Sequence, residues 1–267
     1  MRHSVSDSDT SDQRDVPDQF IGSVGRAFDV LHAFEGRASL GLTELSRRAG
    51  ITKSAAQRMT STLSALGYLA RDEGGRWTLT PRTLAIGASY LATNPLIDRA
   101  NPFLAELSRE TGESVNLSIP DGADMVFVAR FPSSHRIFVQ MALGTRIPMF
   151  CTASGRAVLS GREPGEVREE LARADREAFT PRTLTDVSAI LARIDEARQT
   201  GLAAAEEEFY LGDLAIAAPV RGAGDRILGA VNISGPTSRW TPERLRSDLG
   251  PHLLHTARAI SSHAAKR

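Results

Sequence analysis

A group of polar and basic side chains lies within ten residues, at a spacing that suits contact with a nucleic acid. Lysine and arginine pair with phosphates, and serine and threonine hydroxyls donate to phosphate oxygens. The carboxamide of Gln57 can pair bidentately with an adenine edge, and Arg58 suits either guanine or a phosphate. The group consists of Thr52, Lys53, Ser54, Gln57, Arg58 and Ser61. Its residue types predict a surface that contacts double-stranded DNA.

These side chains need a helix that presents them together, and the surrounding residues predict one. Its apolar positions recur at i, i+3, i+7 and i+10, namely Ala56, Met59, Leu63 and Leu66. They leave the polar group near the start of the helix and on its opposite face. A shorter amphipathic helix at 42–49 comes before it, Gly50 interrupts the pattern, and the Thr52 hydroxyl can cap the second helix. Two short helices joined by a tight turn form a helix-turn-helix.

Two short apolar segments follow, at 68–69 and 77–79, and the residues between them favour a turn. They predict a β-hairpin, or wing, that carries Arg71 and Arg76 within reach of DNA phosphates or a minor groove. A further helix at 21–34, with Ile21, Val24 and Phe28 in its apolar stripe, precedes the pair. Taken alone, the polar helix face could equally be solvated surface. The wing favours the DNA-binding interpretation.

The charge distribution agrees with a basic first domain, although the formal net charge of the 267 residues is zero. Residues 20–92 carry nine Arg and Lys against five Asp and Glu, whereas residues 1–19 carry two against five. The acidic segment is rich in Ser and Asp and poor in large apolar side chains, so we expect it to be disordered. A basic domain suited to a polyanion is therefore masked by an acidic tail.

The length predicts two domains joined by a linker. We expect a disordered tail at 1–19, a winged helix-turn-helix at 20–80, a linker helix at 81–94 and a second domain at 95–267. Small residues along the linker would let another helix approach closely, so it could also be a dimer contact. The second domain begins with a predicted helix at 101–111 and then alternates strands and helices. Its strands are predicted at 115–119, 125–131, 137–140, 214–220 and 227–234. The fold class is therefore α+β.

Several motifs together give the chain a resemblance to the IclR family of bacterial transcriptional regulators, over nearly its whole length after Phe20. The motifs include VGRAFDVLHAF (24–34), LTELSRRAGITKSAAQRMTSTLSALGYL (42–69), TGESVNLS (111–118), ASGRAVL (153–159), GLAAAEEEF (201–209) and NISGPTSRWT (232–241). The resemblance implies a winged-helix dimer or tetramer that binds operator DNA. It also implies a GAF-like second domain that binds a small organic acid or another metabolite as effector.

The resemblance further implies an effector pocket, carried over where the motifs match. The positions are Val139, Ile147, Ala153, Ser154, Ala205, Ala215, Asn232 and Ser234. Here Ala205 stands where an acidic residue is common, Ala215 where cysteine is frequent, and Asn232 where serine is frequent. Ser154 and Gly155 open a helical stretch, so their N–H groups and the hydroxyl could receive a carboxylate. The two alanines leave space and remove polarity, which favours a bulkier acid, such as an aromatic one.

The alternative is an enzyme with a fused DNA-binding domain, such as a hydrolase that uses Ser154 or Cys151. Ser154 lacks the G-x-S-x-G elbow, and Cys151, the only cysteine, has no histidine near it in sequence. His252 and His255 lie three apart on the last helix without a carboxylate motif, so we expect no metal and no cofactor. Glu206, Glu207 and Glu208 suit a structural role better than acid–base work. No apolar run is long enough to cross a bilayer, so we expect a cytoplasmic protein without membrane contact.

Overall fold

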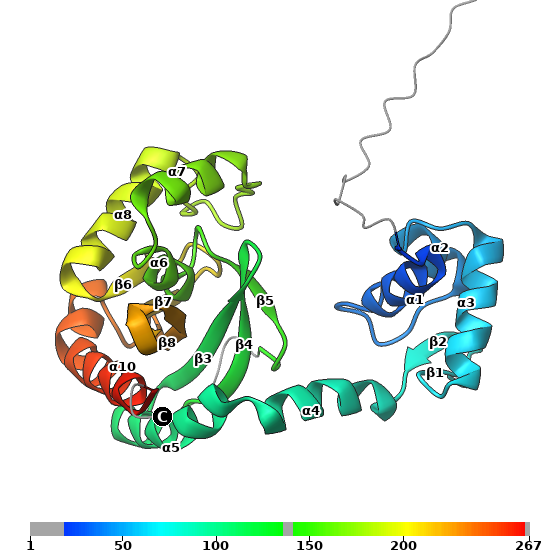
Figure 1. Ribbon diagram of the computed structural model, residues 1–267, viewed down its shortest axis with the longest axis horizontal. Helices are drawn as coiled ribbons and strands as arrows, with labels where there is room; N and C mark the ends of the chain where they lie inside the picture. Colours follow the sequence, from blue (N-terminus) through cyan, green and yellow to red (C-terminus); the bar gives the residue numbers. More distant parts are fainter. Residues whose placement is uncertain (1–18, 136–140, 265–267) are drawn as a thin grey trace, which may run out of the picture. The chain divides into compact units, whose positions relative to one another are not determined.

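The structure is a computed structural model that describes residues 19–135 and 141–264, and the side chains up to 261. The predicted disordered tail and the predicted strand at 137–140 thus lie outside the described residues, apart from Gln19. The chain divides into two compact units between Ala88 and Ser89. This division falls inside the predicted linker helix, and the bounds at 80 and 94 stay a prediction. Each unit is described by itself (Figure 1).

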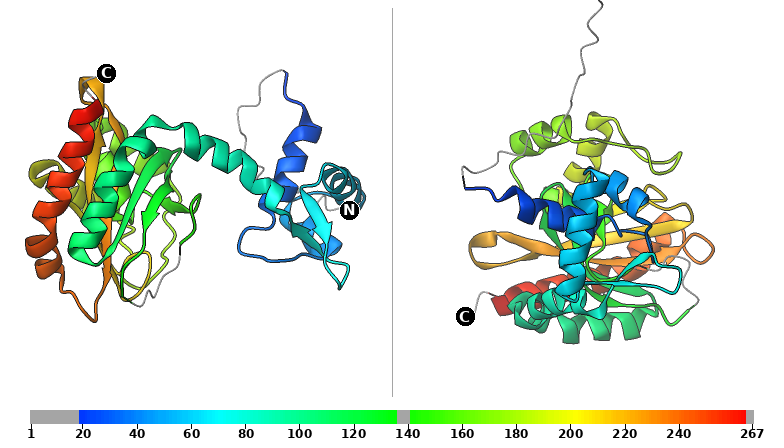
Figure 2. Two further views of the ribbon diagram at one scale, coloured as in Figure 1. Left: turned by 90° about the horizontal axis from the view of Figure 1, so that it is seen from below. Right: turned by 90° about the vertical axis from the view of Figure 1, so that its right-hand side faces the viewer.

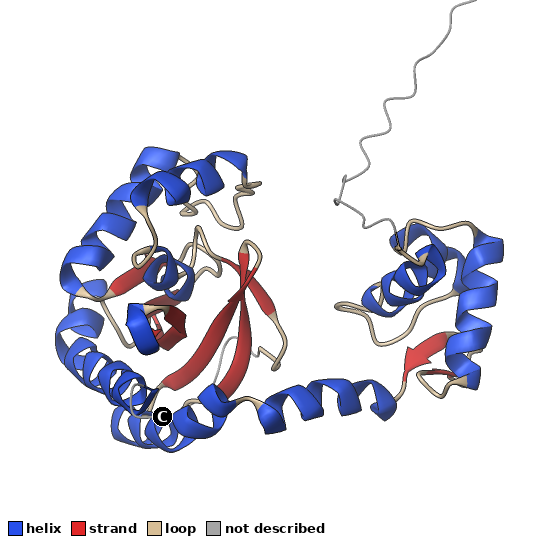
Figure 3. Cartoon of the chain, viewed as in Figure 1, coloured by secondary structure: helices blue, strands red, loops and turns tan. Residues whose placement is uncertain are grey.

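The first unit is the predicted winged helix-turn-helix (Figure 3). It contains α1 (Gly22–His32), α2 (Leu42–Arg48), α3 (Lys53–Ala65), β1 (Leu69–Arg71) and β2 (Trp77–Leu79). The two strands pair antiparallel, and Leu40 forms an isolated bridge to Trp77. A shared core forms because Leu45 of α2, Leu63 of α3 and Trp77 of the wing are all buried. The wing is thereby fixed to the helix pair.

The predicted apolar stripe of α1 is wrong in its first half. Ile21, Val24 and Phe28 are exposed by 64%, 51% and 50% within this unit, whereas Val30 and Phe34 are buried. The reason is that only the end of α1 and the residues after it reach the core that α2 and α3 share. The helix therefore leaves an apolar surface toward solvent.

The linker helix is preceded by a short 3-10 turn, η1 (Pro81–Thr83), which Thr80 caps by accepting a hydrogen bond from the Arg82 amide. The helix itself, α4 (Leu84–Thr93), has no fully buried residue. Leu84, Ile86 and Tyr90 are 71%, 59% and 46% exposed. Like α1, it carries large apolar side chains that are exposed.

The second unit is built on a six-stranded antiparallel sheet with the strand order β5-β4-β3-β8-β7-β6. Its strands are β3 (Ser114–Asp121), β4 (Asp124–Phe131), β5 (Arg146–Pro148), β6 (Ala203–Glu206), β7 (Asp213–Arg221) and β8 (Ile227–Pro236). The edge strands β5 and β6 were not predicted, because three and four residues are too few to show a period of two. The central strands match the predictions to within two residues at each end.

Helices α5 (Pro95–Thr111) and α10 (Gly250–Ala264) lie together on one face of the sheet (Figures 1 and 2). The predicted start of the first of these at 101 is wrong, because Asn94 caps the helix and Pro102 lies inside it. Leu96, Ile97 and Ala100 are buried against the sheet, and this packing outweighs the hydrogen bond that the proline cannot donate. A short helix, α9 (Pro242–Arg244), and a π-helical turn (Leu245–Leu249) lead into α10.

The other face of the sheet is covered by α6 (Ala153–Leu159) and α8 (Val187–Thr200), and α7 (Pro164–Arg173) packs against α8. All seven residues of α6 are buried. Gly155 allows this, since a Cβ atom there would lie 2.2 Å from Cα of Met149. No side chain fits between α6 and the segment before it, and the helix lies close over the sheet.

Candidate DNA interface and ligand cavity

The polar face of α3 is built as the sequence predicts. The Thr52 hydroxyl accepts a hydrogen bond from the Ala55 amide at 3.2 Å and so caps the helix. The polar side chains that follow are all exposed, namely Lys53, Ser54, Gln57, Arg58 and Ser61. Ala56, Thr60 and Leu63 are buried on the opposite face. The exposed group is free of the core and suits contact with DNA, and its role in reading bases stays a prediction.

The two wing arginines differ in how they are held. The Arg71 guanidinium lies 4.2 Å from the centroid of the Trp77 ring and donates to the Gly75 carbonyl at 2.8 Å. Arg76 donates to the hydroxyl and the carbonyl of Ser39, both at 3.0 Å, and lies 3.5 Å from Glu44. Both side chains are exposed. Arg76 also ties the wing to the residues before α2, so it stabilises the domain as well as adding charge.

A cavity lies between the sheet and α6 in the second unit. The space free of atoms along it is about 640 Å³, a volume that includes open solvent. Its lining includes seven residues that the sequence analysis named: Ile147, Ala153, Ser154, Ala205, Ala215, Asn232 and Ser234. Gly155 is not in the lining, because it packs against Met149, and Val139 lies outside the described residues. Binding of an effector by these residues stays a prediction.

The cavity floor follows from strand register. Asn116 of β3 lies opposite Asn232 of β8 on one side and Arg130 of β4 on the other. Paired residues point to the same face of a sheet, so these three side chains form a row on the cavity side. The intervening residues, such as Val115 and Val231, point to the apolar core under α5 and α10. Alternation thus gives the sheet one apolar face and one partly polar face.

At the start of α6, one of the two N–H groups predicted to meet a carboxylate is already engaged. The Gly155 amide donates to the Thr152 hydroxyl at 3.3 Å, so this N–H group caps the helix. The Thr152 hydroxyl in turn donates to the Pro148 carbonyl at 2.6 Å. Ser154 is buried at the cavity wall. Of the two residues at this helix that were predicted to bind a ligand carboxylate, Ser154 lines the cavity and Gly155 does not.

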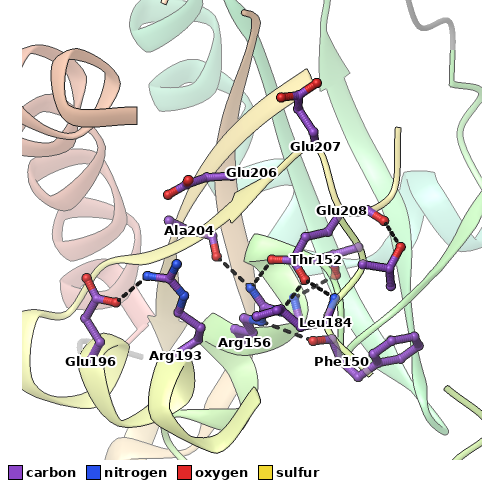
Figure 4. Close-up of polar contacts among 12 residues, drawn as sticks. Phe150, Thr152, Arg156, Leu184, Arg193, Glu196, Ala204, Glu206, Glu207 and Glu208 are labelled. Carbon is purple, nitrogen blue, oxygen red and sulfur yellow. Dashed lines mark hydrogen bonds and ion pairs between the residues drawn. The ribbon is translucent and has the colours of Figure 1, made fainter. Parts of the chain in front are cut away.

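A buried ion pair holds one cavity wall in place (Figure 4). Arg156 of α6 donates to both carboxylate oxygens of Glu208 at 2.5 and 2.6 Å. It also donates to the carbonyls of Phe150 and Ala204, and Glu208 accepts from the Leu184 amide. Arg156 and Glu208 are 0% and 5% exposed. The pair joins α6 to the segment after β6, which continues into Phe209 and Tyr210 of the cavity lining. Glu208 thus has a structural role.

The sequence did not place the other lining residues in the pocket, although Cys151, Glu207 and Glu208 were named for other roles. They are Asn116, Phe127, Arg130, Met141, Cys151, Thr152, Glu207, Glu208, Phe209, Tyr210 and Asp213. Two of them extend an aromatic wall, since Phe209 contacts Tyr210 and Phe179 edge to face, with centroids 4.6 and 4.8 Å apart. The polar Arg130 inside the apolar strand MVFVARF was a usable signal. The other lining residues reach the cavity only through strand register or the path of a loop, which a local sequence pattern does not show.

Cys151 lines the cavity but is fully buried, and burial raises the pKa of its thiol to about 12. A thiol with so high a pKa is not a nucleophile near neutral pH. The cavity lining contains no histidine among the described residues. The described residues also contain no group of three or more metal-ligating side chains placed to hold an ion, and none of the described helices is long and apolar enough to cross a membrane.

Asp213 is a titratable group of the cavity whose pKa is displaced into the physiological range. Burial, together with the smaller effect of the nearby charge of Glu113, raises the pKa of its carboxyl to about 7. Glu113 is itself held by Arg239, at 2.6 and 2.9 Å, and by the Trp240 indole N–H at 2.8 Å. Asp213 therefore changes charge near neutral pH.

A winged helix with an exposed polar recognition face, joined to a domain with a partly buried polar cavity, defines a class of protein. It is the class of DNA-binding transcriptional regulators that respond to a ligand. Comparison with known proteins then identifies the family. The model of the bacterial transcriptional regulator IclR C-terminal domain matches residues 88–262, and the IclR helix-turn-helix domain model matches residues 23–73. This chain belongs to the IclR family of bacterial transcriptional regulators.

Individual relatives agree with this assignment. The chain is 34% identical over 243 residues to the Pca regulon regulatory protein of Pseudomonas putida, covering 90% of this chain and 83% of that protein. It is similar in structure to a putative transcriptional regulator from Rhodococcus sp. RHA1, with a TM-score of 0.80, 36% identity and coverage of 92% and 98%. An IclR homologue from Microbacterium hydrocarbonoxydans, solved with 4-hydroxybenzoate, shares the fold at 23% identity and a TM-score of 0.75, with coverage of 90% and 98%.

Removing the charge of Glu208 should strongly destabilise the second domain. Glu208→Gln leaves the guanidinium of Arg156 buried without a counter-charge, and we expect a loss of about 3–5 kcal/mol in the free energy of unfolding. Chemical denaturation followed by circular dichroism measures it. Glu206→Gln is the matched control, since Glu206 pairs with Arg246 at 3.0 Å where both side chains are about one-third exposed, and it should cost about 0–1 kcal/mol. Equal losses in the two variants would contradict the assigned role.

The raised pKa of Asp213 makes stability depend on pH. From its ordinary value of 3.8 up to about 7, the folded chain keeps a proton that the unfolded chain releases, so stability falls as pH rises through this range. Asp213→Asn has no such proton. The free energy of unfolding of the variant minus that of the wild type should therefore rise from pH 4 to 7 and level off above. Denaturation at several pH values measures this difference, and a flat difference would refute the assignment.

Proposed function

We propose that this chain regulates transcription by binding operator DNA through α3 and the wing, under the control of a small organic acid bound in the cavity. The observation that carries the proposal is the cavity itself, which places amide, hydroxyl and guanidinium groups beside apolar and aromatic walls. A site of this composition orients a small polar ligand without reacting with it. The effector acts by binding one arrangement of the protein more tightly than another.

On the DNA side, the exposed face of α3 suits the major groove. Gln57 is the candidate for reading an adenine, Arg58 can meet guanine or a phosphate, and Lys53 can meet a phosphate. Thr52, Ser54 and Ser61 supply hydroxyls near the same face. Arg71, at the tip of the wing, contributes charge to a phosphate or a minor groove.

On the ligand side, the cavity favours an aromatic acid. Ala205 and Ala215 leave space at the floor, and Phe127, Phe209 and Tyr210 supply aromatic walls. The 4-hydroxybenzoate bound to the Microbacterium relative supports the same class of ligand here. The cationic Arg130 side chain and the Ser154 hydroxyl are the groups suited to the acid.

We expect the protein to act as a homodimer or homotetramer in the cytoplasm, where operator DNA is found. The exposed apolar side chains of α1 and α4 support self-association, because large apolar patches on a soluble surface mark interaction sites. A symmetric dimer would also present two recognition helices to two half-sites. We regard the chain as a binding protein rather than an enzyme, since burial raises the pKa of the Cys151 thiol to about 12 and no histidine lines the cavity beside Ser154 among the described residues.

Substitutions on α3 and on the wing should separate base reading from charge. After selection of a preferred operator from random DNA, Gln57→Ala should cost about 1–3 kcal/mol on that operator and relax the preference at one base position. Arg71→Ala should instead weaken binding to all sequences and lower the salt slope by about 1. Quantitative gel shifts at several salt concentrations measure both. An unchanged sequence preference in Gln57→Ala would remove Gln57 from the reading surface.

An organic acid should alter DNA binding without being consumed. We expect benzoate or 4-hydroxybenzoate at millimolar concentration to change the affinity for the selected operator several-fold, and the acid to be recovered intact by chromatography. Glyoxylate, a two-carbon acid, is the control for ligand size. An effect of glyoxylate alone would overturn the aromatic assignment, and turnover of the acid would favour the enzyme alternative.

A further inference from the structure

One polar atom on the cavity floor has no partner within the protein. In the described part of the chain, Ser118 Oγ and Asn232 Oδ1 are buried side-chain oxygens that accept no hydrogen bond. Only Asn232 lines the cavity, and its side chain is 94% buried, at 6% exposure. A buried acceptor left unsatisfied costs about 1–3 kcal/mol, so an interaction that satisfies it is favourable by a similar amount. A ligand that brings a donor would satisfy it.

The side chains on the same face of β7 cannot supply that donor. The residue opposite Asn232 on β7 is Ala217, and the next one toward Asp213 is Ala215. Neither side chain can hydrogen-bond, so they leave Asn232 beside apolar carbon on that side. On its other side Asn232 faces Asn116 across β3, a second buried carboxamide that lines the cavity. The cavity floor therefore presents one buried acceptor, Asn232 Oδ1, with two alanines on one side and the carboxamide of Asn116 on the other.

The same row also contains a positive charge at a defined separation. Asn232, Asn116 and Arg130 occupy consecutive strands β8, β3 and β4. Two strand spacings put the Cα atoms of Asn232 and Arg130 about 10 Å apart. Burial lowers the pKa of Arg130, but from so high a value that the guanidinium stays charged at neutral pH. The cation is a suitable partner for a ligand carboxylate, in addition to the Met141 carbonyl to which Arg130 already donates.

A ligand that meets both groups has to reach across the intervening strand β3. A two-carbon acid spans less than one strand spacing of about 4.8 Å. A benzene ring that bears a carboxylate and a hydroxyl at opposite positions is longer and is better suited to meet both side chains. Phe127 and Phe209 line the same cavity and suit the faces and edges of such a ring.

We propose that the effector is a hydroxylated aromatic acid, whose hydroxyl donates to Asn232 Oδ1 while its carboxylate lies at Arg130, and that Asn232 selects for the hydroxyl. The inference rests on the proposed function, because it assigns the chemistry of the same cavity. It adds an orientation for the ligand and a residue that discriminates between ligands. Asn232 selects because an acid without the donor leaves its oxygen unpaired.

Calorimetric titration of the full-length protein with 4-hydroxybenzoate, benzoate and 4-methoxybenzoate tests this proposal. The methoxy compound keeps the oxygen and loses the donor. We expect 4-hydroxybenzoate to bind about 10-fold or more tightly than either of the others. In Asn232→Leu, which has a similar volume and no hydrogen-bonding group, the ratio should fall to about 1. Benzoate should bind this variant at least as well as it binds the wild type.

Two further variants separate the roles. Ser118→Ala removes the other unpaired oxygen, which does not line the cavity, and it should leave the 10-fold preference unchanged. Arg130→Gln should weaken all three acids to a similar extent, about 10-fold or more, and keep the preference for the hydroxyl. Thermal melting of each variant shows whether the fold is retained. If Asn232→Leu is unfolded, Asn232→Ser replaces it, and its shorter side chain should reduce the preference for the hydroxyl.

The outcomes distinguish this inference from the proposed function. Binding of the acids with no preference for the hydroxyl, or a preference that survives in Asn232→Leu, would overturn the inference and leave an aromatic-acid regulator standing. Failure of all three acids to bind at millimolar concentration would overturn both. A preference that disappears in Asn232→Leu and persists in Ser118→Ala supports the inference.

Discussion

The antiparallel pairing of β3 with β8 is the constraint on which the second domain depends. It joins residues 114–118 to residues 230–234, which are more than 100 positions apart in the chain, at the centre of the sheet. The pairing sets the register for every strand on either side. Because side chains alternate between faces, a slip of one residue would move Asn116 and Asn232 into the apolar core and bring Val115 and Val231 to the cavity. The burial of that core therefore specifies the polar row at the same time.

The buried pair of Arg156 and Glu208 plays a different part. Such a pair gains little net stability over apolar side chains, since both charges lose their hydration. What it provides here is position. Arg156 has four hydrogen bonds to Glu208 and to two main-chain carbonyls, and these bonds fix where α6 lies relative to the segment after β6. Two walls of the cavity are thus held by one side chain that is not itself part of the lining.

The sequence was sufficient for the parts of the structure that local patterns determine. The cap at Thr52, the apolar spacing of α3 and the Gly-rich turn of the wing are all local, and they located the helix-turn-helix to within a residue or two. Most of the named cavity positions came from the family resemblance. Asn116, Arg130 and Asp213 were missed because each reaches the cavity only through strand register or burial. The exposed half of α1 was missed because periodicity shows an apolar face but not what covers it.

The energies involved show why one hydrogen bond in the cavity can matter for DNA binding. Coupling between two sites in regulatory proteins is typically about 1–3 kcal/mol, or 5-fold to 150-fold in affinity. Pairing a buried oxygen such as Asn232 Oδ1 is worth a similar amount. A ligand that makes this bond in one arrangement of the protein and not in another would by itself supply a coupling of that size. Tight binding alone would supply no coupling, because a ligand that binds both arrangements equally well does not shift the equilibrium between them. A regulator of this kind therefore requires a polar contact that only one arrangement of the protein completes. A buried acceptor on the sheet floor, opposite a wall that Arg156 positions, is suited to provide such a contact.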